Sequence, residues 1–324
     1  MAVSIRHPRP TRGDVRAATE NDLRGELGRL QGVEPRRIFL TGGATEANTA
    51  VLFYVRSRDP SGSLRCRVRY PEYPSLFHTA HAAGFSVDDS PRPATIALLS
   101  QPRNPEGTLD GHAELDRWAT GARHLLVDET FREFSGRPSL AGRRPRTWVT
   151  SSFTKFYGGD DLRVGYVVAP DEERDRFAAF HGLLYDEIAP YSVAGALRCL
   201  RSLPRIRAEV RQILATNLDA LRSGLPDARS PVAPLFFDRV PGVDGMRVAR
   251  RCLAASVLVC PGSFFGDPTG VRICLTRRTF PRDFEAYLEV RGRLRAERAR
   301  ATTASPQRAR RRRAGTDRAR AGPG

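Results

Sequence analysis

Lysine occurs once in the 324-residue sequence, at position 155, although the chain carries 53 basic residues. Arginine would serve equally well for solubility, salt bridges or phosphate contacts. It cannot form an imine, because its guanidinium group stays protonated and is not nucleophilic. Lys155 is therefore a candidate for covalent chemistry with a carbonyl group, although one surface lysine surviving by chance would give the same pattern.

Two segments have residues suited to bind a phosphate group near this lysine. In WVTSSFTKFYGGDDLRVGYVVAP, Ser152 and Arg163 flank the lysine closely enough to contact one phosphate, the arginine as a bidentate donor. In IFLTGGATEANTAV, Gly42 and Gly43 separate a predicted strand from a predicted helix, where free backbone N–H groups favour an anion. Neither GxGxxG nor a P-loop is matched, which argues against dinucleotides and nucleoside triphosphates. A plain strand-to-helix turn, capped near Thr45, would have the same sequence.

Three further side chains follow predicted strands and suit a flat heterocyclic ligand. Tyr73, in YPEYPSLFHTA, has a ring that can stack on a heterocycle or belong to the core. Asn104, in LLSQPRNPEGTL, has an amide that can donate to a ring oxygen, or it simply forms a Pro/Gly turn. Asp128, in HLLVDETFREF, ends a buried strand, where a protonated pyridine nitrogen would be a suitable partner; a helix cap is the alternative.

His78 and His81 form an HxxH pair with no carboxylate pattern around it, so we expect no metal site.

The elements that must position these residues alternate between strand-like and helix-like segments. Strands are predicted at residues 37–41, 65–70, 95–100, 124–128, 147–152 and 163–168, and helices at 21–30, 45–54, 75–83 and 111–120. This alternation predicts a mostly parallel sheet with helices on both faces. The candidate residues follow the carboxyl ends of successive strands, which form the edge where open α/β sheets bind ligands.

The chain is predicted to divide into four regions. An N-terminal arm (1–20) precedes a large three-layer α/β/α domain (21–200) that would bind the cofactor. A smaller α+β domain (201–300) follows, with strands at 234–238, 255–259 and 271–275 and helices at 243–253 and 281–298. Residues 301–324 are dominated by Arg, Ala, Gly and Ser, and this composition predicts a disordered tail.

Taken together, these segments resemble the fold-type I, class I/II aminotransferases, especially the histidinol-phosphate aminotransferase branch. The similarity runs from about residue 33 to residue 275. The resemblance implies a pyridoxal 5′-phosphate cofactor and two catalytic residues. Lys155 stands at the position of the Schiff-base lysine, and Asp128 at that of the acid that pairs with the pyridine nitrogen. It also assigns the remaining cofactor-binding and substrate-binding residues: Gly43, Ala44 and Thr45 at the phosphate loop, Ser152 and Arg163 on the phosphate, Tyr73 on the ring, Asn104 on the ring oxygen and the substrate, and Arg272 on the substrate carboxylate.

The same resemblance implies an aminotransferase that exchanges an amino group between an amino acid, or an amino-acid-like amine, and a 2-oxo acid, and that acts as a homodimer. Two positions depart from the family pattern. Phe131 stands where the family usually has a tyrosine that donates to the ring oxygen of the cofactor, and no tyrosine precedes Tyr54 to match the family's N-terminal active-site tyrosine.

Other functions remain open on the sequence. The same cofactor supports decarboxylation, cyclisation or β/γ-replacement on an amino acid, and the fold could also be an inactive member. A nucleic-acid binder is a further alternative, because the segment from Arg291 onward has a net charge of +10 and leaves +7 of the total +17 for the rest. We find neither a helix-turn-helix pattern nor aromatic residues interleaved with the arginines, so we expect no specific nucleic-acid partner.

The five cysteines, at positions 66, 199, 252, 260 and 274, are scattered and odd in number. This pattern favours reduced thiols in a cytoplasmic protein over a disulfide framework or a zinc site. The first residues show no apolar signal-peptide segment, and no apolar run is long enough to span a bilayer, so we expect neither secretion nor membrane insertion.

Overall fold

A mostly parallel seven-stranded sheet forms the centre of the computed structural model, which describes residues 5, 9–59, 62 and 64–320, with side chains as far as residue 302. The strands lie in the order β1-β7-β6-β5-β4-β2-β3. β2 to β6 pair in parallel, whereas β7 is antiparallel to β1 and β6. The six strands predicted for this sheet are all present, and the short β3 was not predicted. The bounds are β1 Ile38–Thr41, β2 Arg65–Val68, β3 Ser86–Asp88, β4 Ala94–Ser100, β5 Ala122–Asp128, β6 Thr147–Ser152 and β7 Gly165–Val168.

Helices cover both faces of this sheet, because successive strand residues point to opposite sides and both sides are apolar. Leu99 and Val127 face one core, and Leu98 and Leu126 face the other. The first face is covered by α2 (Glu20–Gln31), α5 (His112–Ala119) and α8 (Pro190–Arg201), and the second by α3 (Ala44–Ser57), α4 (Pro74–Ala82) and α7 (Arg174–Leu184). The predicted three-layer α/β/α architecture is therefore confirmed.

A second, three-stranded antiparallel sheet has the order β8-β10-β9 and its own core. Its strands are β8 Leu235–Arg239, β9 Cys260–Pro261 and β10 Gly270–Cys274, and α10 (Gly245–Ala254) and α11 (Phe280–Arg320) pack against it. The strand predicted at residues 255–259 is wrong. Ser256 has φ +59°, and the N–H of Val257 turns back to the carbonyl of Cys252, so this segment closes the end of α10 instead of extending.

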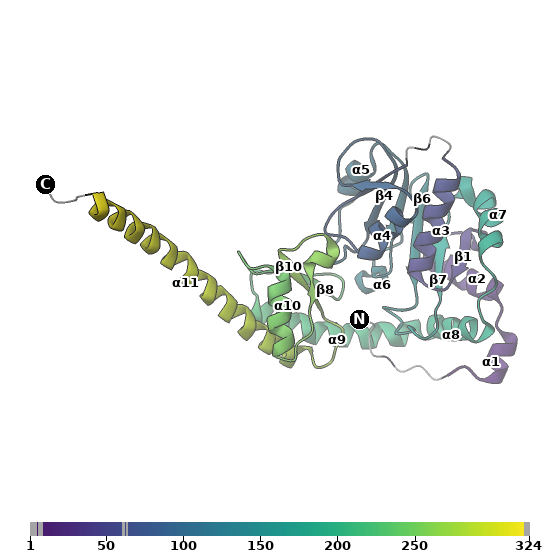
Figure 1. Cartoon of the computed structure of the whole chain (residues 1–324). Helices are drawn as coiled ribbons and strands as arrows, with labels where there is room; N and C mark the ends of the chain where they lie inside the picture. Colours follow the sequence, from purple (N-terminus) through teal and green to yellow (C-terminus); the bar gives the residue numbers. More distant parts are fainter. Residues whose placement is uncertain (1–4, 6–8, 60–61, 63, 321–324) are drawn as a thin grey trace.

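A single helix, α9 (Leu203–Gly224), joins the two sheets and runs below the large one in Figure 1. Ile206 and Val210 belong to the core of the large sheet, and Leu221 belongs to the core of the small one. The predicted boundary near residue 200 therefore lies beside a helix that both cores share.

The two ends of the chain are more helical than the sequence predicts. In the predicted N-terminal arm, Thr11 and Asp14 form a capping box that starts the short helix α1 (Arg12–Ala17). At the other end, α11 continues to Arg320 and projects away from the body of the molecule (Figure 1). Arginine and alanine are strong helix formers, which explains a helical backbone here. The disorder predicted for residues 301–324 stays a prediction, and residues 321–324 lie outside the described part of the chain.

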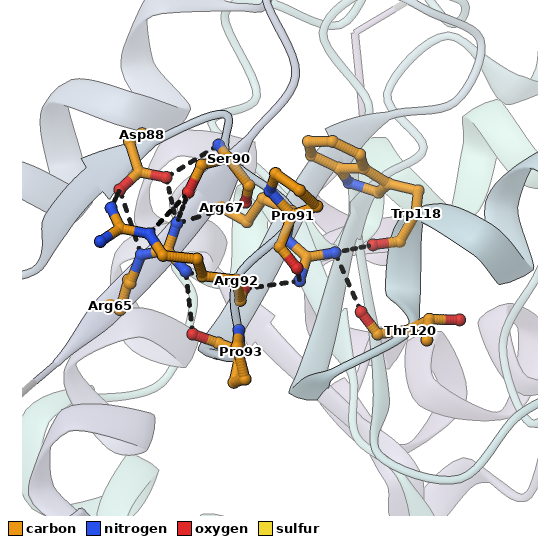
Figure 2. A network of polar contacts seen from close by, with 9 residues as sticks. All are labelled: Arg65, Arg67, Asp88, Ser90, Pro91, Arg92, Pro93, Trp118 and Thr120. Atoms are coloured by element: carbon orange, nitrogen blue, oxygen red, sulfur yellow. Dashed lines mark hydrogen bonds and ion pairs between the residues drawn. The ribbon is translucent and has the colours of Figure 1, made fainter.

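A buried arginine ties the edge of the large sheet to the loops beside it (Figure 2). The side chain of Arg67, on β2, donates to the backbone carbonyls of Trp118 at 2.6 Å, Thr120 at 3.0 Å, Arg92 at 2.9 Å and Pro91 at 3.3 Å. Burial lowers its pKa, but the guanidinium group keeps its charge because an arginine pKa lies far above neutral. These carbonyls precede β4 and β5, so the network lies at the amino ends of these strands.

We predict that Arg67→Ala lowers the free energy of unfolding by about 2–4 kcal/mol, because a buried guanidinium group that donates to four backbone carbonyls is removed. The matched control is Arg92→Ala, in the same network, where the side chain is 72% exposed and the loss should stay within about 0.5 kcal/mol. Chemical denaturation of both variants measures the difference. Equal losses would show that Arg67 does not hold the loops.

Candidate active site

The predicted cofactor-binding residues line one cavity at the carboxyl end of β4, β5 and β6, facing the start of α3. This edge is where an open α/β sheet binds its ligand. The cavity is lined by Gly43, Ala44, Thr45, Tyr73, Ser100, Asn104, Asp128, Thr130, Phe131, Ser152, Thr154, Lys155 and Arg163. All nine residues predicted to bind the cofactor are in this set, although they are spread over 120 positions of the chain (from 43 to 163).

One end of the cavity is suited to bind a phosphate group. α3 begins at Gly43, which has φ +137° and gives the helix no side-chain cap, so the first N–H groups are left for a ligand. β7 approaches this turn so closely that a Cβ at Gly165 would lie 2.4 Å from the carbonyl carbon of Gly43. A Cβ at Gly43 itself would lie 3.0 Å from Nη2 of Arg163, which places the guanidinium group directly beside the turn. Ser152, at the end of β6, adds a hydroxyl group.

Asp128 is buried at the end of β5 and is held by two donors. The N–H of Thr130 donates to Oδ1 at 2.9 Å, and Nδ2 of Asn48 donates to Oδ2 at 3.1 Å. Asn48 is fully buried on α3 and is itself oriented by the hydroxyl of Thr150, which donates to Oδ1 of Asn48 at 2.5 Å. Burial raises the pKa of Asp128, while the hydrogen bonds from Thr130 and Asn48 and the charge of Lys155 oppose that shift. The carboxylate is therefore kept in one orientation, in a place where a cationic partner would stabilise it further.

Lys155 lies in the same cavity in surroundings that favour its neutral amine. Burial lowers its pKa, and the positive charge of Arg272 lowers it further; the acidic groups of Asp160, Cys274 and Asp128 oppose the shift. A lysine with a lowered pKa has a larger neutral fraction, and the neutral amine is the nucleophile. The pKa of Tyr73 is raised, first by burial and then by Asp128, so its phenol remains protonated at neutral pH.

Arg272 comes from β10 of the small sheet and meets the large domain at Asn104. Its Nη1 donates to Oδ1 of Asn104 at 2.9 Å, and its guanidinium carbon lies 4.5 Å from the ring centroid of Phe265. Its buried Nε has no hydrogen-bond partner among the described residues. The side chain is thus fixed in place with one donor unused, next to the wall residue Asn104, although Arg272 itself is not among the residues that line the cavity.

Some residues of the site were not predicted from the sequence. Ser100, Thr130 and Thr154 also line the cavity, and Asn48 contacts Asp128. The sequence does contain a sign of the role of Asn48: it is a polar residue on the core-facing side of a helix that is otherwise apolar there. A buried amide at such a position needs hydrogen-bond partners. Phe131 does line the cavity, at the place where the sequence comparison expects a hydroxyl donor.

Comparisons with known proteins agree with this geometry. The model of the family "Aminotransferase class I and II" matches residues 17–280. The chain is similar to histidinol-phosphate aminotransferases. It is 29% identical over 234 residues to the one from Paracoccus denitrificans, a match that covers 64% of this chain. It is 26% identical over 297 residues to the one from Natronomonas pharaonis, a match that covers 83% of this chain and 80% of the relative. The chain spans 62% of the length of the Paracoccus protein, which is under two thirds.

A solved structure from Streptococcus suis, described as a PLP-dependent aminotransferase, shares the fold. The TM-score is 0.72 with 21% identity, and the match covers 88% of this chain and 83% of the other. At that identity the likeness bears on the fold alone, and it agrees with the three-layer architecture described above.

The residues in the cavity fit pyridoxal phosphate, the cofactor of this family. The close approach of β7 to the turn leaves no room for a side chain at Gly165, so the strand packs directly against the backbone of Gly43 and Ala44, whose N–H groups would meet the phosphate. A buried carboxylate, an amine with a lowered pKa and an aromatic ring complete a donor set that suits a phosphorylated pyridine aldehyde. Among the described residues no cluster of His, Cys, Asp or Glu could hold a metal ion, and no helix is long and apolar enough to span a membrane.

We predict that Gly165→Ala weakens the binding of pyridoxal phosphate roughly tenfold and lowers the free energy of unfolding by about 1–3 kcal/mol, because the added methyl group displaces the turn at Gly43. Gly182→Ala is the matched control, since a Cβ there meets open space on α7 and helix propensity favours alanine. Equilibrium titration and thermal unfolding of both variants measure the effects. Unchanged affinity in Gly165→Ala would separate this turn from the phosphate.

Proposed function

The chain belongs to the class I and II aminotransferases, and we propose that it is a pyridoxal-phosphate-dependent aminotransferase that moves an amino group between an amino acid, or an amino-acid-like amine, and a 2-oxo acid. The observation that carries this proposal is the single cavity that joins Lys155 and Asp128 to the phosphate-binding turn, with Arg272 bonded to Asn104 at its wall. The histidinol-phosphate aminotransferases among its relatives support the same class of reaction.

The bound cofactor supplies an aldehyde that accepts an amine and a protonated ring that withdraws electrons from the substrate α-carbon. Lys155 would hold this aldehyde through its amine until an amino substrate displaces it. The released amine of Lys155, whose pKa is lowered, would serve as the general base that removes the proton from the substrate α-carbon and as the general acid that gives it back. The same side chain therefore acts as the covalent anchor, the general base and the general acid.

Asp128 would keep the pyridine nitrogen protonated. Its carboxylate already accepts from Thr130 and Asn48, which leaves it oriented for one further donor from the ring. Tyr73 would stack on the ring, and Gly43, Ala44, Thr45, Ser152 and Arg163 would bind the phosphate. These assignments rest on the shared cavity and on the charges and donors of its wall.

Arg272 would bind the substrate carboxylate, and Asn104 would contact both this arginine and the ring oxygen. The unpartnered Nε of Arg272 and its fixed position over Phe265 support this role. A substrate held at both its amine and its carboxylate could not rotate about the bond between its nitrogen and its α-carbon, so Arg272 would decide which bond of the α-carbon is broken.

A homodimer and a cytoplasmic location also belong to this proposal. Leu183 and Leu184 at the end of α7 and Tyr191 at the start of α8 are exposed apolar side chains, with Leu183 84% exposed, and a partner subunit would remove them from water. None of the five cysteines, all of which lie in the described part of the chain, forms a disulfide, which suits a reducing compartment. Sedimentation of the purified protein tests the dimer, and Leu183→Glu should weaken it.

We predict that Lys155→Arg abolishes covalent attachment of the cofactor while keeping the fold, because arginine preserves the charge but cannot form the bond to the aldehyde. Borohydride reduction with pyridoxal phosphate, followed by peptide mass mapping, should label the Lys155 peptide in the wild type only. Labelling of the terminal amine is the internal control, since both proteins have it. Amino-group transfer by the variant would contradict the proposal.

We predict that Asp128→Asn still binds the cofactor but loses at least about a hundredfold in removal of the substrate α-proton, because an amide does not keep the ring nitrogen protonated. Wash-out of deuterium from the α-carbon, across a screen of amino donors, measures this step. An unchanged rate would remove Asp128 from the role. Proton exchange without a matching 2-oxo acid product would favour another reaction of the same cofactor, such as decarboxylation or replacement.

A further inference from the structure

Glu72 is a fully buried carboxyl group that the proposed reaction does not use. It lies in the turn between β2 and α4, directly before Tyr73, and is 1% exposed. A charged group is rarely buried so completely unless specific donors compensate for the lost water. Its surroundings therefore indicate what the carboxyl group does.

Three donors meet this carboxyl group, and all come from residues of the cavity wall. The N–H of Tyr73 donates to Oε1 at 2.6 Å, the hydroxyl of Ser100 donates to Oε1 at 2.6 Å, and the N–H of Ser100 donates to Oε2 at 2.8 Å. Tyr73 precedes α4 and Ser100 ends β4, so one side chain connects two separate segments of the wall.

The backbone of Glu72 extends the connection to the small domain. Its N–H donates to the carbonyl of Phe265 at 3.0 Å. Phe265 ends the 3₁₀ turn η3 (Gly262–Phe265), and its ring lies against the guanidinium group of Arg272. The residue thus contacts the segments that carry the stacking ring, the end of β4 and the support of the substrate arginine.

The number of donors favours the ionised form of Glu72. A carboxylate accepts all three hydrogen bonds, whereas a glutamine amide accepts only at its oxygen and would turn its NH₂ group toward at least one backbone N–H. Burial raises the pKa of Glu72 to about 7, and the hydrogen bonds from Ser100 and Tyr73 and the charge of Arg103 oppose that shift. Arg103, in the loop after β4, is itself paired with Glu106 at 3.1 Å.

We propose that Glu72 is a positioning residue of this active site: its carboxylate fixes the Tyr73 and Ser100 segments in the cavity wall and thereby sets how tightly the cofactor ring is held. The proposal rests on the proposed function for the identity of the cofactor. The anchoring itself is a property of the protein alone, and it can be measured without any ligand.

The experiment compares the wild type with Glu72→Gln and Glu72→Asp by amide hydrogen exchange of the cofactor-free protein and by titration with pyridoxal phosphate. In Glu72→Gln we expect exchange at Tyr73 or Ser100 to rise roughly tenfold and the Kd for pyridoxal phosphate to rise by a similar factor, as for one lost buried hydrogen bond. Glu72→Asp keeps the charge one methylene further back and should give intermediate values.

Asp238→Asn is the control for a general loss of stability. Asp238 is a buried carboxylate of the small sheet that accepts from Tyr287 and Arg291, away from the cavity wall. This variant should be less stable yet keep wild-type exchange at Tyr73 and Ser100.

In the wild type, protection of these amides should fall as the pH is lowered through about 7, where Glu72 takes up a proton, and this step should be absent in Glu72→Gln.

The outcomes separate this inference from the proposed function. Unchanged exchange at both Tyr73 and Ser100 in Glu72→Gln overturns the anchoring role, and raised exchange with an unchanged Kd overturns the role in holding the cofactor. A wild-type protein that binds no pyridoxal phosphate refutes the proposed function, while the exchange data still decide whether Glu72 holds the two segments.

Discussion

The burial of the Asp128 carboxylate at the carboxyl edge of the large sheet is the constraint around which the site is arranged. An ionised carboxylate in such a place is unstable unless donors or a cation compensate for the lost water. Thr130 and Asn48 supply two donors, and Thr150 orients Asn48 in turn. The chain thus needs α3, β5 and β6 in one mutual arrangement. That arrangement also brings the start of α3, where a phosphate would bind, to the same edge as Lys155.

The same principle explains why segments from distant parts of the chain meet here. Glu72 connects the turn before α4 with the end of β4, and Arg272 connects β10 with the loop that carries Asn104. Arg67, on β2, connects this strand to neighbouring segments in the same way, because its side chain donates to four backbone carbonyls. Because a half-satisfied buried network is costly, each of these groups favours the one geometry in which its partners are all present. The site is rigid for polar reasons as well as through apolar packing.

The sequence predicts the large sheet well because its strands are short apolar runs between helical patterns, and the candidate residues follow directly from the ends of those strands. Asn48 and Glu72 were missed because a single polar residue at a core-facing position carries no local signal of what it will meet. The strand predicted at 255–259 failed because local β-propensity ignored the turn at Ser256 and the 87% exposure of Leu258. The lesson is that alternation along the chain predicts layers, while polar partners across layers require the structure.

The near-complete replacement of lysine by arginine has a chemical consequence at this site. An aldehyde cofactor reacts with any accessible neutral amine, and this chain has one side-chain amine, which lines the same cavity as the glycine turn at the start of α3. The positive charge of Arg272 lowers the pKa of Lys155, and because a guanidinium group is not nucleophilic it does not compete for the aldehyde. A lysine in its place would share both the charge and the reactivity. Electrostatic activation and covalent attachment are therefore divided between two side chains, Arg272 and Lys155.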